Sequence, residues 1–213
     1  MLAGFSVPVT GPRFARPPSP ALVELAQRHL RSRPLELAVR KMAPDDTGAM
    51  RKIPADARIE AGWALARLGD GGWWPAIDRG LRGGRLDDEV AVALAEILRA
   101  APRPVAWVTT VPSTRLGDVC TELAERLAAE LGVEHLTLVA RKAERPPQRE
   151  MANAVQQVAN VRGAFAVTSD PPKGPCLLVD DLRHSGWTQA MTGGQLRRRG
   201  AGEVYPLVLT TAF

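Results

Sequence analysis

The chain has 213 residues, of which 45% are hydrophobic and 24% are charged, a composition typical of a folded globular protein. Lys and Arg outnumber Asp and Glu by 28 to 23, a mild excess that permits an anionic ligand but does not require nucleic acid. Two cysteines exclude a disulfide framework and a cysteine zinc cage. No window resembles a membrane span or a signal peptide, so we expect a soluble, cytoplasmic protein.

The first part of the chain is predicted to be a tail followed by a mainly helical unit. Residues 1–19 are rich in Pro and Gly and are predicted to be a tail or linker. Residues 20–100 form the predicted helical unit, in which Trp63, Trp73 and Trp74 are expected to be core or contact residues rather than stacking platforms. Its expected elements are helices over 20–33, 55–68 and 87–99, a short strand within 35–42 and a turn over 44–48.

From residue 101 to residue 213 the pattern changes to strands that alternate with helices. The expected strands are 105–111, 135–139, 164–167, 175–179 and 204–210, and the expected helices are 116–131 and 187–199. Residues 141–163 are polar and irregular, with one helix expected among them. This alternation predicts an α/β domain with a doubly wound, mainly parallel sheet.

The segment 176–191 carries the clearest chemical pattern. An apolar run leads into Asp180 and Asp181, and a short loop with Ser185, Gly186 and Thr188 then opens a helix. Loop amides and a helix N-terminus favour a phosphate at the carboxyl end of a strand. The aspartates would repel that phosphate, but they suit sugar hydroxyls or a hydrated metal ion. The pattern predicts a 5-phosphorylated ribose site, and the alternative is an acidic turn at an ordinary strand-to-helix junction.

VDDLRHSGWT, residues 179–188, resembles the phosphoribosyl pyrophosphate (PRPP) motif of type I phosphoribosyltransferases. This resemblance implies that Asp180 and Asp181 contact the ribose. From their chemistry we also expect Asp180 and Asp181 to hold Mg²⁺ through water, and we expect no zinc. It also implies that the 5-phosphate is bound by residues 184–188, among them Ser185, Gly186, Trp187 and Thr188. His184 lies where some members of the family carry a catalytic carboxylate. It is interpreted as a general base or phosphate partner, or else as an exposed loop histidine.

Two further segments are candidates for the same site. The family's pyrophosphate loop corresponds to VPSTRLGD, in which Ser113, Thr114 and Arg115 are the candidate ligands, although the family's Arg-Gly pattern is absent. In the resembling families the region around 141–162 forms a mobile hood. Its basic residues are candidates to close on pyrophosphate or to follow a nucleic-acid backbone, unless they form a solvated loop. These residues are Arg141, Lys142, Arg145, Arg149 and Arg162.

The wider sequence narrows the resemblance. Residues 111–132 and 146–167, taken with the PRPP motif, resemble ComF-type phosphoribosyltransferases and, more closely, the domain at the C-terminus of some bacterial RecQ-type DNA helicases. Residues 40–74 are similar to the segment that precedes that domain, so the resemblance spans about 35–213. It implies PRPP or a related ligand as substrate, a role in DNA metabolism, and DNA or a helicase as partner. Whether the chain forms a homo-oligomer is left open by the sequence.

Three functions remain open at this stage. The chain contains no G-x-x-x-x-G-K-[ST] motif, so it is not expected to be an ATP-driven motor. The first function is a Mg²⁺-dependent phosphoribosyltransferase or PRPP-binding protein. The second is a non-catalytic module that binds DNA or a helicase through its Arg-rich surface. The third is a PRPP sensor that couples ligand binding to a partner.

Overall fold

The computed structural model describes residues 17–101, 103–113, 117–143, 145–146 and 150–212. The helices are α1 (Pro20–Arg31), the 3-10 turn η1 (Ala55–Ala57), α2 (Trp74–Gly83), α3 (Asp88–Ala100), α4 (Val119–Leu131), α5 (Ala154–Val161) and α6 (Trp187–Arg198). The strands are β1 (Leu35–Leu37), β2 (Met42–Pro44), β3 (Met50–Lys52), β4 (Gly62–Arg67), β5 (Trp107–Thr110), β6 (Glu134–His135), β7 (Val139–Arg141), β8 (Phe165–Val167), β9 (Cys176–Arg183) and β10 (Val204–Thr211).

A mainly parallel sheet forms the centre of the molecule. Within the described residues its six strands lie in the order β1-β4-β10-β9-β5-β6. Strand β1 is antiparallel to β4, and the other neighbouring pairs are parallel. The ribbons β2–β3 and β7–β8 are antiparallel pairs outside this sheet. The predicted mainly parallel α/β sheet is confirmed.

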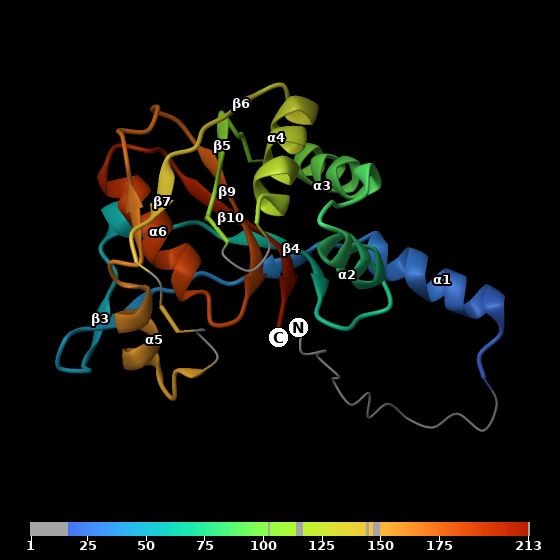
Figure 1. Cartoon of the computed structure of the whole chain (residues 1–213), viewed down its shortest axis with the longest axis horizontal. Coiled ribbons are helices and arrows are strands. Elements are labelled where there is room, and N and C mark those ends of the chain that lie inside the picture. Colours follow the sequence, from blue (N-terminus) through green and yellow to red (C-terminus); the bar gives the residue numbers. More distant parts are fainter. Residues whose placement is uncertain (1–16, 102, 114–116, 144, 147–149, 213) are drawn as a thin grey trace.

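Helices cover both faces of the sheet, as Figure 1 shows, with α2, α3 and α4 on one side and α5 and α6 on the other. Successive residues of a strand face opposite sides, so β9 contributes to two cores. Leu177 and Val179 pack in the first core with α2, α3 and α4. Cys176 and Leu178 pack in the second core with α5 and α6. The predicted doubly wound arrangement is therefore confirmed.

The helix predicted over residues 55–68 is wrong. Residues 55–57 form η1, and residues 62–67 form β4, which lies between β1 and β10. Because β4 is covered on both faces, its residues from Gly62 to Ala66 are all buried and show no alternation. A Cβ at Gly62 would lie only 1.8 Å from the Pro206 carbonyl oxygen, so close approach of the two strands requires glycine here.

The N-terminal region shares the central sheet with the rest of the chain. Strand β4 belongs to the predicted 20–100 unit, yet it pairs with β10 near the C-terminus. Helix α1 begins where it was predicted, and the Ser19 hydroxyl caps it by accepting from the Leu22 N–H at 3.3 Å. No residue of α1 is buried, and Figure 1 shows it extending away from the sheet. No helix among the described residues is long and apolar enough to cross a bilayer.

Candidate functional site

The acid pair lies where the sheet changes its winding direction. Strand β9 pairs with β5 up to Val179 and then continues beside β10 as far as Arg183. From β5 the chain passes through α4 to β6, whereas from β9 it passes through α6 to β10 on the other side. Open α/β sheets bind ligands at the carboxyl ends of strands that diverge in this way. We refer to this place, with the loops that follow β5 and β9, as the β5–β9 edge.

Asp180 is a buried carboxyl group held by α6. It is 5% exposed, and the Gln189 side-chain amide donates to one of its oxygens. The Asp181 N–H donates to the other oxygen at 2.9 Å. Burial raises the pKa of Asp180 well above its ordinary value, and the negative charge of Asp181 raises it further. Asp180 therefore acts as a fixed link between β9 and α6.

Asp181 is the more accessible member of the pair. It is half-buried, and one carboxylate oxygen accepts from the Leu182 N–H at 2.7 Å. The other oxygen accepts from the Ser113 hydroxyl at 3.3 Å, and Ser113 lies in the loop after β5. Two residues predicted on separate motifs, the ribose side and the pyrophosphate side, are thus in contact.

The two aspartates have different surroundings because they are consecutive residues of a strand. Asp180 follows Leu178 to the face covered by α6, where Gln189 meets it. Asp181 follows Val179 to the face of α4, where Ser113 precedes that helix. From the sequence the two aspartates were expected to be equivalent acceptors for sugar hydroxyls. In the structure Asp180 instead supports the contact between β9 and α6, and Asp181 lies nearer to solvent.

The loop after β9 turns sharply at Gly186 and opens α6. Gly186 has φ +79°, a left-handed conformation that favours glycine. A Cβ there would also lie 3.0 Å from Arg183 Nε. Trp187, predicted in the phosphate loop, is fully buried in the second core. Its side chain is thus a packing residue that anchors the first turn of α6.

The remaining predicted loop residues lie around this turn. His184, Ser185 and Thr188 are half-buried. The Ser185 hydroxyl oxygen is itself buried and has no hydrogen-bond partner among the described residues. A buried hydroxyl without a partner costs free energy, so a ligand atom that accepts a hydrogen bond from it would stabilise the folded protein.

Two arginines that the sequence analysis missed flank the loop. Arg40 donates to the Ser185 carbonyl from Nε at 2.9 Å and from Nη2 at 2.6 Å. Its guanidinium also lies 4.1 Å from the centroid of the Trp187 ring. Arg183 donates from Nη2 to the Ala38 carbonyl at 2.6 Å. Both side chains therefore end beside the N-terminus of α6.

These two guanidiniums concentrate positive charge beside the loop. Within the described residues neither Arg40 nor Arg183 forms an ion pair, and their hydrogen bonds go to main-chain carbonyls. Burial lowers the pKa of each, and the positive charge of Arg40 lowers the pKa of Arg183 further. Two cations that repel each other near a helix N-terminus are stabilised by an anion.

The sequence offered one usable signal for this pair. Arg183 lies within the PRPP-like segment, three residues before Gly186, and a positive charge so close to a predicted phosphate loop indicates a phosphate contact. Arg40 is 145 residues from Ser185 along the chain, and only the fold brings them together.

The predicted flap residues separate into two groups. Arg141 donates to the Pro112 carbonyl at 3.1 Å and lies over the Phe165 ring, so it reaches the loop that contains Ser113. Lys142 and Arg145 are exposed, and Arg162 pairs with Asp46 in the β2–β3 turn. Thr114, Arg115 and Arg149 lie outside the described residues.

The donor set suits a hydrated metal ion rather than a protein-enclosed one. No group of three or more His, Cys, Asp or Glu that could hold a metal occurs in the described part of the chain. Asp181 supplies a half-exposed carboxylate, whereas the oxygens of Asp180 are engaged by Gln189 and the main chain. Mg²⁺ typically keeps several waters and binds one or two carboxylates together with ligand phosphates. The residues fit Mg²⁺ in that mode.

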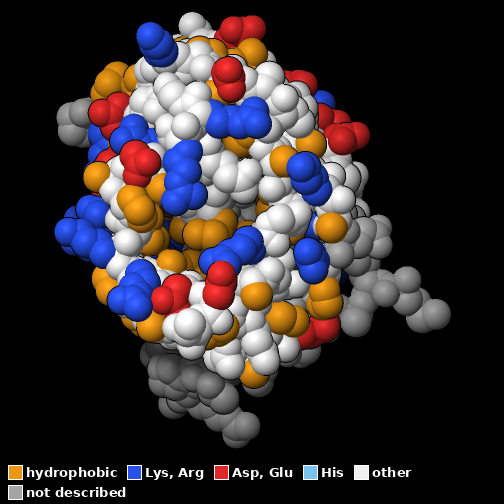
Figure 2. Space-filling view, turned by 90° about the vertical axis from the view of Figure 1, so that its left-hand side faces the viewer, with side chains coloured by type: hydrophobic (Ala, Val, Ile, Leu, Met, Phe, Trp, Pro, Cys, Tyr) orange, Lys and Arg blue, Asp and Glu red, His pale blue; other side chains and the backbone are white. Residues whose placement is uncertain are grey.

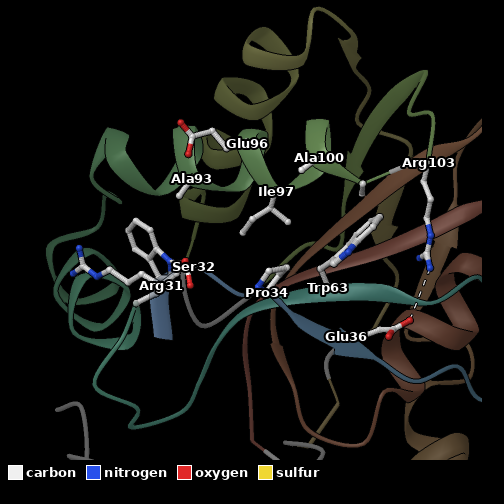
Figure 3. A pocket seen from close by; sticks show the side chains of 12 residues that line it. Arg31, Ser32, Pro34, Glu36, Trp63, Ala93, Glu96, Ile97, Ala100 and Arg103 are labelled. Carbon is white, nitrogen blue, oxygen red and sulfur yellow. Dashed lines mark hydrogen bonds and ion pairs between the residues drawn. The ribbon is translucent and has the colours of Figure 1, made fainter. Parts of the chain in front are cut away.

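A hollow of about 620 Å³ lies away from this edge, between the end of α1, β1, β4 and α3. Figure 3 shows Arg103 reaching toward Glu36 beside Trp63, and the ion pair measures 3.9 Å. The Arg103 guanidinium is 5.0 Å from the Trp63 ring centroid, and Arg31 lies 4.6 Å from that of Trp73. Both tryptophans are 8% exposed and belong to the first core, which confirms that they are core residues.

No family model matches the chain, and no curated protein matches it. Among solved structures it is similar to an adenine phosphoribosyltransferase, at 12% identity and a TM-score of 0.42, over 87% of this chain and 89% of that chain. It is also similar to the orotate phosphoribosyltransferase from Aeropyrum pernix, at 20% identity and a TM-score of 0.39, over 89% of this chain and 81% of that chain. We therefore base the proposed function on the residues of the β5–β9 edge rather than on these similarities.

Proposed function

We propose that the chain binds PRPP or a related 5-phosphoribosyl ligand at the β5–β9 edge. The observation that carries this proposal is the pair Arg40 and Arg183, two guanidiniums beside the loop that opens α6 that have no carboxylate partner in the part of the chain that the structure describes. A carboxylate with a neighbouring hydroxyl, Asp181 with Ser113, lies on the adjoining strand end. A pair of cationic side chains next to acceptors for hydroxyl groups suits a sugar that carries a phosphate.

The phosphate end of the ligand is assigned to the loop and the two arginines. Each guanidinium has five N–H donors, of which Arg40 uses two and Arg183 one in the hydrogen bonds described above. The remaining donors, the Ser185 hydroxyl and the amides around Gly186 and Thr188 can all donate to phosphate oxygens. Charge-assisted bonds of this kind are worth about 1.5–3 kcal/mol each.

The ribose end is assigned to Asp181, with Asp180 as its support. The half-buried Asp181 carboxylate accepts hydrogen bonds from vicinal hydroxyls, and its contact with Ser113 orients it. Asp180, through Gln189, holds β9 against α6 and so fixes the spacing between the ribose and phosphate ends. Asp181 would hold Mg²⁺ through water, and the ion would supply charge neutralisation for a leaving diphosphate.

If the chain is catalytic, the reaction is displacement of pyrophosphate at the anomeric carbon. A nucleophile forms the new bond to that carbon while the carbon–oxygen bond to pyrophosphate breaks. His184 is the candidate to accept the proton of the nucleophile. Ser113, Thr114 and Arg115 are the candidates for the leaving pyrophosphate, together with Arg141, which donates to the Pro112 carbonyl.

The proposed setting is DNA metabolism, as an accessory related to RecQ helicases or to ComF-type proteins. The support for this setting is the sequence resemblance over residues 35–213. The second hypothesis is a binding module without turnover. Such a module would act as a PRPP sensor or as a DNA- or helicase-binding domain.

Calorimetric titration of the whole chain with PRPP, with and without Mg²⁺, tests the proposal. We expect saturable heat in the wild type. In Asp181→Asn we expect the fitted affinity for PRPP to fall at least tenfold, because a neutral amide replaces an ionic acceptor. The matched control is Asp78→Asn on α2, whose carboxylate pairs with Arg82 at the surface. Equal heats in wild type and Asp181→Asn, or no heat at all, would contradict the proposal. If the chain binds PRPP but releases no pyrophosphate when any nucleobase is added, the result would support the PRPP sensor.

A further inference from the structure

A second hollow, of about 460 Å³, opens between the β2–β3 hairpin, the end of α5 and the later turns of α6. The face of the molecule that carries β3 is turned toward the viewer in Figure 2, where Lys and Arg side chains surround a depression with hydrophobic side chains inside. The residues of α6 that line this hollow lie between Ala190 and Arg198, whereas the loop of the β5–β9 edge meets α6 at Gly186. This hollow therefore belongs to a different part of the molecule.

The floor of the hollow is apolar and has no aromatic ring. It includes Ile53, Ala57 and Ala190, which are buried, and Met191, which is half-buried. A flat nucleobase typically stacks on an aromatic or guanidinium plane in single-strand sites. Aliphatic walls instead suit the side chain of a hydrophobic residue or another aliphatic group.

The rim carries an excess of positive charge. Four cations line it, namely Arg51, Lys52, Arg162 and Arg198. Arg51 pairs with Asp45 at 2.9 Å, and Arg162 pairs with Asp46. Within the described residues no carboxylate pairs with Lys52 or Arg198, so the rim keeps two positive charges that a ligand can meet.

The hairpin also offers an open strand edge next to the hollow. Among the described strands β3 pairs with β2 alone, and all three of its residues are exposed. Met42 and Met50, on the two strands of this hairpin, are 40% and 51% exposed. An exposed strand edge accepts an extended peptide by main-chain hydrogen bonds, and neighbouring pockets then select its side chains.

We infer that this hollow is a docking site for an acidic peptide segment of a partner protein. The segment places a hydrophobic side chain on the Ile53–Met191 floor and carboxylates against Lys52 and Arg198. Charge complementarity and the open β3 edge favour a peptide. A single-stranded nucleic acid is disfavoured, because none of the described residues that line the hollow has an aromatic ring on which a base can stack.

Selection of random linear peptides displayed on phage against the whole chain tests this inference. We expect the enriched sequences to carry Asp or Glu on both sides of one aliphatic or aromatic residue. Fluorescence anisotropy of a labelled, enriched peptide then measures its affinity for variants. Lys52→Glu combined with Arg198→Glu is expected to weaken binding about tenfold to a hundredfold, because it reverses the rim charges. Both residues are exposed, so the fold is expected to be kept.

Lys173→Glu is the matched control, since Lys173 is an exposed lysine outside the hollow. It is expected to bind the enriched peptide like the wild type. No enrichment of acidic sequences, or equal loss of affinity in the control, overturns the inference. Binding of a labelled single-stranded oligonucleotide that is lost in the Lys52 and Arg198 double variant, without acidic peptide enrichment, overturns it in favour of nucleic acid.

Discussion

Two arginine-rich regions of the molecule differ in how their charge is balanced. At the β2–β3 hairpin, Arg51 and Arg162 each have a carboxylate, Asp45 and Asp46. At the β5–β9 edge, the hydrogen bonds of Arg40 and Arg183 within the described residues go to main-chain carbonyls. Burial lowers the pKa of both guanidiniums, and the positive charge of Arg40 lowers the pKa of Arg183 further. Exposed ion pairs contribute little and serve mainly to orient side chains.

The difference separates structural charge from charge available to a ligand. In the hairpin, Asp45 also accepts from Thr47 and Ala49, so its pair with Arg51 belongs to the turn. At the β5–β9 edge the two guanidiniums are partly buried, and no carboxylate of the described residues pairs with them, an arrangement that costs free energy until an anion binds.

Replacing both arginines of the β5–β9 edge is expected to have the largest effect on ligand binding. In Arg40→Gln combined with Arg183→Gln, the affinity for ribose 5-phosphate falls about a hundredfold or more, because two charge-assisted contacts are lost. Calorimetric titration measures this. Arg51→Gln, in the hairpin, is the matched control and keeps wild-type affinity. Equal losses in both variants would mean that overall charge, not the pair, determines binding.

Asp181→Asn is expected to weaken ribose 5-phosphate binding about tenfold, a smaller effect, because the hydroxyls lose one ionic acceptor. Phosphate itself lacks those hydroxyls, so binding of inorganic phosphate is expected to change little or to strengthen as a nearby negative charge is removed. Parallel titrations with the two ligands measure the difference. A loss that is the same for both would argue against a ribose contact.

Asp180→Asn tests the supporting role of the buried carboxyl. Because the folded-state pKa of Asp180 is raised, the folded chain binds its proton more tightly, and stability falls as pH rises from the ordinary value of 3.8 through the raised value. Asparagine removes this dependence. The Gln189 amide can turn over, so that its oxygen, which has no partner among the described residues, accepts from the new amide.

Thermal unfolding across this pH range checks the prediction. Asp180→Asn is expected to melt at or above the wild-type temperature at neutral pH, with a flatter dependence on pH. Asp180→Leu, which leaves Gln189 and the Asp181 N–H without an acceptor, serves as the contrasting variant and is expected to lose about 1–3 kcal/mol. A wild-type slope in Asp180→Asn would contradict the assignment of the raised pKa.

The smallest effect is expected at Asp45. Hydrogen bonds from Thr47 and then Arg51 lower its pKa to about 2. The stability that the ionised Asp45 carboxylate contributes to the hairpin is therefore fully present when the pH is above 3.8, its ordinary pKa. This stability is lost as the pH falls through about 2. Carbon-detected NMR titration of the side chain measures the pKa. Asp45→Asn is expected to leave ribose 5-phosphate binding unchanged, and a titration near 3.8 would contradict the turn geometry.

The sequence predicted the parts of the fold that depend on local pattern. The apolar run before Asp180, the helix after Gly186 and the alternation of strands and helices all indicated the doubly wound sheet. Strand β4 was missed because a strand buried on both faces shows no alternation, and its Ala and Leu residues are typical of helices. Tertiary pairing with β10 decides its conformation.

The candidate site was predicted in outline but not in its details. The strand was expected to end at Val179, which made the two acids look like neighbours in a loop. Pairing with β10 extends β9 to Arg183, so the acids alternate between faces. The contact between Ser113 and Asp181 follows from adjacent parallel strands, whereas Arg40 reaches the loop only through a long-range contact that no local pattern encodes.

The most direct measurement is an amide NMR titration of the ¹⁵N-labelled chain with ribose 5-phosphate. We predict saturable shifts of the Ser185, Gly186 and Thr188 amides that disappear in the Arg40 and Arg183 double glutamine variant but persist in Arg51→Gln. Shifts confined to the β2–β3 hairpin, or shifts at the loop that persist without the two arginines, would contradict the claim that their unbalanced charge forms the phosphate site.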